Sequence, residues 1–137
     1  MNFPSHGSFD KYIILQFKSG LREQRRELQL SIEQAEQEIR GLADSRPSSI
    51  EDAAPDNSLK EEIFRRLSQY RSRLRLVDVA LEAIHSGSFG ICADCGGAIG
   101  TRRLQAVPWT SYCIQCQERL EKAGPAESVS LPLLALL

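Results

Sequence analysis

Four cysteines carry the strongest chemical signal in this sequence of 137 residues. They form two Cys-x-x-Cys pairs separated by 17 residues, Cys92 with Cys95 and Cys113 with Cys116. Each pair can bring two thiolates to one edge of a metal tetrahedron, and two pairs supply the four sulfur ligands that Zn²⁺ accepts. Four cysteines leave no open position for water or substrate, so the pattern predicts one structural Zn²⁺ and no catalytic metal.

Disulfides and redox catalysis are the alternatives for these cysteines. Residues 1–20 lack the basic start, apolar run and small-residue cleavage site of a secretory signal, so an oxidising compartment is not indicated. A thioredoxin-like pair belongs in a βαβ unit, whereas the chain before Cys92 has a helical pattern and Gly96 and Gly97 predict a turn. Thiol oxidation with release of zinc stays open as a regulatory hypothesis.

Two long helices are expected to position this zinc finger, because apolar residues recur at 4-3-4-3 spacing in two stretches. The stripes are Leu28, Ile32, Ala35, Ile39 and Leu42, then Ile63, Leu67, Tyr70, Leu74, Val77, Leu81 and Ile84. Such a narrow stripe buries one face against a single partner helix. The sequence therefore predicts a mainly α fold built on an antiparallel coiled-coil hairpin.

The register of the hairpin follows from the two stripes, because facing positions in an antiparallel pair have a constant sum. The predicted pairs are Ile39 with Ile63, Ala35 with Leu67, Ile32 with Tyr70, Leu28 with Leu74, Arg25 with Val77 and Leu21 with Leu81. The chain then folds back within residues 45–57, where prolines and small polar residues also predict a loop.

Local signals predict the helix ends. Ser58 and Glu61 form a capping box that would start the second helix, and Gly87 would end it just after His85. Gly20 costs about 1 kcal/mol relative to alanine inside a helix, so a bend or break near Gly20 is expected in the first helix.

These signals divide the chain into four parts. We expect an N-terminal tail over 1–9, the hairpin over 10–86 with its tip at about 45–57, the finger and a short following helix over 87–121, and a flexible tail over 122–137. A net charge of −1 gives no general attraction to nucleic acid. The apolar run at 131–137 is far shorter than the roughly 20 residues of a membrane helix. We expect a cytoplasmic monomer with no membrane contact and no sequence-specific DNA binding.

Catalysis is not indicated, because a long thin hairpin leaves little room for an enclosed pocket and no nucleophile pair stands out. His85 is interpreted as a favourable cation at a helix end. At the predicted tip, Glu51 and Asp52 precede Ala53 and Ala54. These acids fit either a solvated turn or a projected carboxylate that perturbs a partner, and spacing alone leaves both interpretations open.

The region from Gly87 to Cys116 resembles the DksA/TraR zinc-finger family. It matches the family at the four cysteines and at Ile99, Arg103 and Pro108. Ala93 stands where the family usually has Asp, Glu or Ser, but that position is not a metal ligand. The resemblance covers roughly residues 10–120.

The resemblance implies a function for the tip. In this family the hairpin enters the secondary channel of bacterial RNA polymerase, and a D-x-A motif at its tip alters initiation. The matching residues here are Asp52 and Ala54, with Glu51 beside them. A second tip aspartate known in the family is replaced by Ser49.

The resemblance does not imply a role for ppGpp. Family members that use this nucleotide bind it through basic residues, and the matching positions here are Gln69, Leu76 and Gln117. None of the three can offer a cation to a phosphate.

Further residues of the finger have more than one possible role. Arg102 and Arg103 are either contacts for polymerase or nucleic acid, or solvated residues paired with nearby acids. Trp109 and Tyr112 are expected to pack the finger against the hairpin. A transcript-cleavage factor, a zinc-ribbon nucleic-acid binder and a coiled-coil adaptor are the alternative functions.

Overall fold

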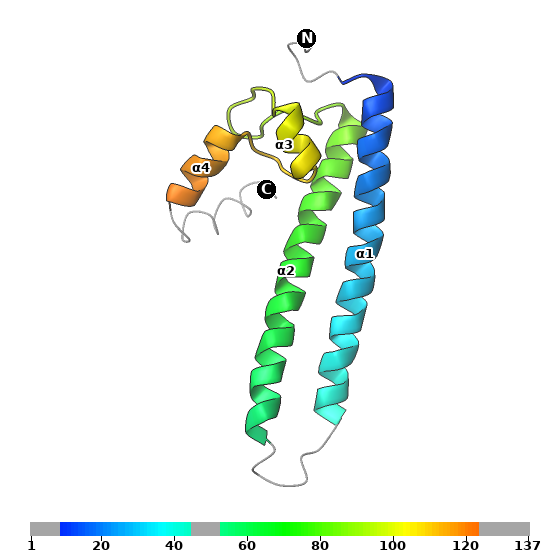
Figure 1. Cartoon of the computed structure of the whole chain (residues 1–137), viewed down its shortest axis with the longest axis vertical. Coiled ribbons are helices and arrows are strands. Elements are labelled where there is room, and N and C mark those ends of the chain that lie inside the picture. Colours follow the sequence, from blue (N-terminus) through cyan, green and yellow to red (C-terminus); the bar gives the residue numbers. More distant parts are fainter. Residues whose placement is uncertain (1–8, 45–52, 124–137) are drawn as a thin grey trace.

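The structure, a computed structural model, describes residues 9–44 and 53–123. Its helices are α1 (Lys11–Asp44), α2 (Ala53–Ser86), α3 (Thr101–Ala106) and α4 (Ile114–Lys122). The long helices α1 and α2 lie side by side, and the finger that contains α3 and α4 lies beside the C-terminal end of α2 (Figure 1). The predicted mainly α hairpin followed by a small finger is confirmed.

The seam between α1 and α2 follows the predicted register. Ala35, Ile63 and Leu67 form one buried cluster, and Ile39 packs against it. Nearer the finger, Leu21 and Val77 are completely buried. Because the stripes are narrow, this single seam holds the two helices together over most of their length.

Three exposed ion pairs cross between the helices beside the seam. They join Arg25 to Asp78 at 3.3 Å, Glu38 to Arg66 at 2.9 Å and Glu36 to Arg71 at 2.8 Å. Exposed pairs of this kind contribute roughly 0 to 1 kcal/mol each, so they help to select the register more than they stabilise the fold.

Helix α1 runs through Gly20 without a break, so the predicted break is wrong. Phe17 lies one turn before, with its ring centroid 5.2 Å from that of Phe89, and Leu21 follows with no exposed surface. Burial of these two side chains is worth more than the roughly 1 kcal/mol that a helical glycine costs.

Helix α2 begins at Ala53, five residues before the predicted capping box, so Ser58 and Glu61 lie inside the helix. The predicted tip at 45–57 therefore includes the first turn of α2. Pro55 is compatible with that turn, because its missing N–H would have had no acceptor within the helix.

The predicted end of α2 at Ser86 is confirmed. Gly87 has a φ of 81°, its N–H donates to the Ile84 carbonyl at 3.3 Å, and the Ser88 N–H donates to the Ala83 carbonyl at 2.8 Å. This is a Schellman motif, which satisfies two of the last helical carbonyls. With 34 residues in each helix, the hairpin is about 50 Å long.

One hydrophobic core, called the base core below, joins the finger to the base of the hairpin. Its buried residues are Leu21, Val77, Ala80, Phe89, Cys92, Ile99, Leu104 and Cys116. Phe9, which we expected in the N-terminal tail, packs on this core, with its ring centroid 6.1 Å from Phe17 and 6.0 Å from Phe89. The first described residue thus belongs to the fold.

Gly90 makes a close contact that only glycine allows. Its φ is 86°, and a Cβ atom added there would overlap the ring of Phe9. An L-residue would be strained by the backbone and would also push the aromatic ring out of the base core.

Replacing Gly20 with alanine should raise the free energy of unfolding by about 1 kcal/mol, because an added Cβ meets no atom within 4 Å and helix propensity improves. Urea denaturation followed by circular dichroism measures the change. A loss of stability would contradict this prediction, because it would show that an added Cβ at Gly20 disturbs a close contact.

Replacing Gly90 with alanine should lower the free energy of unfolding by roughly 2 to 4 kcal/mol, the sum of left-handed strain and overpacking. Gly87→Ala is the matched control, because Gly87 also has a positive φ but open space around its added Cβ. It should lose only the strain component, about 1 to 2 kcal/mol. In a Phe9→Ala background the two substitutions should cost the same; a persisting difference would contradict the contact with Phe9.

Candidate metal centre

The four cysteine sulfurs converge on one point. All four Sγ atoms lie within 4.8 Å of one another, and the Cys95 and Cys113 sulfurs are 3.9 Å apart. A tetrahedron with Zn–S bonds of about 2.3 Å has sulfurs separated by about 3.8 Å along each edge. The distance between Cys95 and Cys113 is therefore that of a tetrahedral edge, and the four ligands fit a closed Zn²⁺ site.

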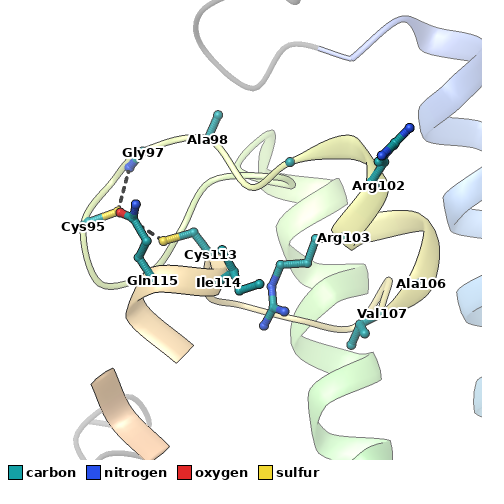
Figure 2. Close-up of a pocket in the computed structure, with 11 residues that line it drawn as sticks. Cys95, Gly97, Ala98, Arg102, Arg103, Ala106, Val107, Cys113, Ile114 and Gln115 are labelled. Carbon is teal, nitrogen blue, oxygen red and sulfur yellow. Dashed lines mark hydrogen bonds between the residues drawn. The ribbon is translucent and has the colours of Figure 1, made fainter. Parts of the chain in front are cut away.

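The first cysteine pair sits in a tight hairpin. An isolated antiparallel bridge joins Ile91 to Ala98, and the Cys92 N–H donates to the Gly97 carbonyl at 2.8 Å. Gly96 supplies the turn with a φ of 72°. The Gly97 N–H points at the Cys95 sulfur from 3.4 Å, as Figure 2 shows. The predicted turn at Gly96 and Gly97 is confirmed, and it brings backbone donors to the thiolates.

The second pair is positioned by the start of α4. Cys113 is the N-cap residue and Cys116 lies in the first turn, where the helix dipole favours negative charge. The Ala93 N–H donates to the Ser111 carbonyl at 2.8 Å and so ties the first pair to the loop before the second. Cys92 and Cys116 are buried, while Cys95 is exposed.

The charge on these sulfurs depends strongly on their surroundings. Burial disfavours the Cys92 thiolate, but the backbone N–H groups of Cys95, Cys113 and Asp94 outweigh it and lower the Cys92 pKa to about 6. Burial, followed by the neighbouring Cys113 and Cys92 side chains, raises the pKa of Cys116 to about 12. Four thiolates this close together require a cation, and Zn²⁺ supplies the charge that the cluster lacks.

Sequence reasoning missed two residues beside this centre. The Arg119 Nη2 atom donates to the Cys116 Sγ at 3.1 Å and to the Asp94 Oδ2 at 2.7 Å. Spacing in the sequence could have predicted the contact of Arg119 with Cys116, because residues three apart share a helix face. The contact with Asp94 depends on tertiary structure.

Arg102 and Arg103, for which the sequence left a contact or a solvated role open, differ in their surroundings. The Arg103 Nε atom donates to the Tyr112 carbonyl at 2.9 Å, and its Nη2 atom donates to the Thr110 Oγ1 at 3.3 Å. Arg103 therefore braces the loop before the second cysteine pair. Arg102 is exposed and points away from Arg103 (Figure 2), so it is the more solvent-exposed of the two arginines.

The finger packs on the hairpin as predicted. Trp109 and Tyr112 both pack against the base core. The Arg73 guanidinium of α2 lies over the Trp109 ring, 4.0 Å from its centroid, which adds a cation–π interaction. These contacts join the metal centre to the long helices.

The predicted tip residues lie elsewhere. Asp52 and Glu51 fall outside the described residues, and Ala54 lies in the first turn of α2. That turn is at the opposite end of the hairpin from the finger (Figure 1). Among the helices that the structure describes, none is long and apolar enough to cross a membrane.

This chain is similar in sequence to known proteins. The family model described as the prokaryotic dksA/traR C4-type zinc finger matches residues 87–122. An uncharacterized protein of Aquifex aeolicus is 38% identical over 104 residues, which cover 74% of this chain and 71% of that protein. The RNA polymerase-binding transcription factor DksA of Salmonella typhimurium is 28% identical over 105 residues, covering 77% of this chain and 69% of that factor.

The likeness extends to solved structures. The structure of transcription factor DksA2 from Pseudomonas aeruginosa has a TM-score of 0.74 and 35% sequence identity, and the match covers 88% of this chain and 92% of that one. The match therefore includes the hairpin as well as the finger. The family resemblance predicted from the cysteines is confirmed, and the chain belongs to the DksA/TraR C4-type zinc-finger family.

Proposed function

We propose that this protein binds bacterial RNA polymerase and modulates transcription initiation by inserting its hairpin tip into the secondary channel. The observation that carries the proposal is the hairpin itself: two 34-residue helices that extend about 50 Å from the finger. A relative that shares the family is an RNA polymerase-binding transcription factor. The protein would act in the cytoplasm as a regulator of the polymerase and would not be an enzyme itself.

The tip would act through Asp52 and Ala54, with Glu51 as a second acid. A carboxylate carried into the polymerase can interact with a cation, a basic side chain or a mobile loop near the active site. The small side chain of Ala54 would permit a close approach. Arg102, exposed on the finger, is a further candidate contact at the base.

Zinc would act by holding the base of the hairpin. A finger of about 30 residues buries too little apolar surface to fold alone, so metal binding would supply part of its folding free energy. Cys92 and Cys116 lie in the same core cluster as Leu21 and Val77. Loss of the metal would therefore disturb the packing between the finger and both long helices.

The nucleotide ppGpp would not act through this protein. Gln69 and Leu76 are exposed on α2 but carry no positive charge. The Gln117 Nε2 atom donates to the Glu121 Oε1 at 3.2 Å, so the third position lies beside a carboxylate. Neither arrangement attracts a polyphosphate.

Asp52→Asn should remove most of the effect on transcription in vitro, because the charged interactions at the tip are lost. About tenfold or more of the variant protein should be needed to match the effect of wild type. Purified polymerase on responsive promoters gives the measurement, and helicity and zinc content should match wild type. Glu82→Gln, which neutralises an exposed carboxylate near the finger end of α2, is the control and should act like wild type.

The same assay separates the alternatives. Equal activity of Asp52→Asn and wild type would contradict the role of the tip, and absence of any effect by a folded, zinc-loaded protein would contradict polymerase regulation. Transcript cleavage that depends on Asp52 would favour a cleavage factor. A strong increase in regulation on adding ppGpp would contradict its proposed independence.

Removing zinc should unfold the finger while leaving much of the long-helix signal. Trp109 is the single tryptophan, so its fluorescence reports on the finger, and far-ultraviolet circular dichroism reports on α1 and α2. Zinc affinity should fall as the pH falls from about 8 to 6, because protons compete for the thiolates that bind the metal. A finger that keeps its Trp109 signal without metal would contradict the role proposed for zinc.

A further inference from the structure

A single arginine nitrogen links the two halves of the metal centre. Arg119, on α4, places its Nη2 atom 2.7 Å from the Asp94 Oδ2 and 3.1 Å from the Cys116 Sγ. Asp94 lies between Cys92 and Cys95 in the first pair, whereas Cys116 belongs to the second. The two hydrogens of one nitrogen therefore have an acceptor on each side of the site.

Charge gives this contact a role in metal retention. Four thiolates around Zn²⁺ leave a net charge of −2, and Asp94 adds another negative charge nearby. The Cys116 sulfur is buried, so water solvates it poorly and a charge-assisted N–H donor replaces part of that solvation. The contact with Cys116, followed by the charge of Asp94, also raises the pKa of Arg119.

We propose that Arg119 is a positioning residue of the zinc centre. Asp94 orients the guanidinium, which donates to the Cys116 sulfur, offsets the negative charge of the tetrathiolate site and slows the loss of zinc. Groups that hydrogen-bond to metal ligands often change metal affinity by 10- to 100-fold, although they never touch the metal.

A simple surface ion pair is the competing explanation. The Arg119 and Asp94 side chains are 69% and 45% exposed, and exposed pairs contribute little to folding. A pair of that kind would leave zinc release and the electronic state of the sulfurs unchanged. The two explanations therefore differ in measurements made on the folded, metal-loaded protein.

Arg119→Gln should release zinc to a colorimetric chelator roughly 10-fold faster than wild type or more. Lys122→Gln removes the same charge from the next turn of α4 and is the matched control, with an expected rate like wild type. Arg119→Lys, which keeps a cationic donor, should restore part of the retention. Asp94→Asn should give an intermediate rate, because the cation remains but loses its orienting carboxylate.

Cobalt substitution gives a readout that stability alone would not move. In Arg119→Gln loaded with Co²⁺, the sulfur-to-metal charge-transfer band should shift to lower energy, because the Cys116 sulfur has lost a hydrogen-bond donor. Lys122→Gln should leave the band in place. An unshifted band in Arg119→Gln, or equal zinc release by the two glutamine variants, would overturn the proposal. Polymerase regulation does not enter either measurement.

Discussion

The structure depends on a core in which metal ligands and helix residues are buried together. Cys92 and Cys116 share a cluster with Leu21 of α1 and Val77 of α2, so the sulfurs are part of the packing as well as of the metal site. A thiolate buried among apolar side chains is unfavourable unless a cation and hydrogen-bond donors compensate it. Folding of the finger, binding of the metal and closure of the hairpin base are therefore coupled.

Away from this core, the described parts of the two helices meet along a narrow apolar seam with exposed ion pairs beside it. The cluster around Ala35, Ile63 and Leu67 is narrow, and the polar faces of both helices remain in solvent. Such a structure buries little apolar surface per residue, so its strength grows with the length of the seam. The same geometry leaves the outer faces of both arms free to contact a surrounding partner.

Periodicity predicted the parts of the fold that depend on repeated burial. The 4-3-4-3 stripes indicated both helices and their register, because each apolar residue needs a partner on the facing helix. Local signals were mixed: Gly87 correctly predicted the end of α2, whereas Gly20 and the Ser58 capping box did not predict helix boundaries. They act over single turns and are worth about 1 kcal/mol, which is less than the burial of Phe17 and Leu21 around Gly20.

The sequence also predicted part of the candidate site, namely the metal ligands. Cysteine spacing indicated the four ligands, because a tetrahedral metal imposes its own geometry on short turns. The link from Asp94 to Arg119 was not predictable, since it joins residues 25 positions apart that only the folded finger brings together. The hydrogen bonds of Arg103 to Tyr112 and Thr110 were not predictable for the same reason. The sequence alone does not distinguish Arg103 from its neighbour Arg102.

The Phe9 ring packs against Gly90 and against the core that joins the finger to the base of the hairpin. The described contacts between finger and helices extend from this end as far as Arg73, which lies over Trp109, so the part of α2 before Arg73 continues for about 30 Å beyond them. A rotation of about two degrees at this anchor displaces the far end by about 1 Å, and a displacement of that size can change the effect of a positioned group greatly. The aromatic packing at the base therefore sets the angular precision with which the arm can be aimed.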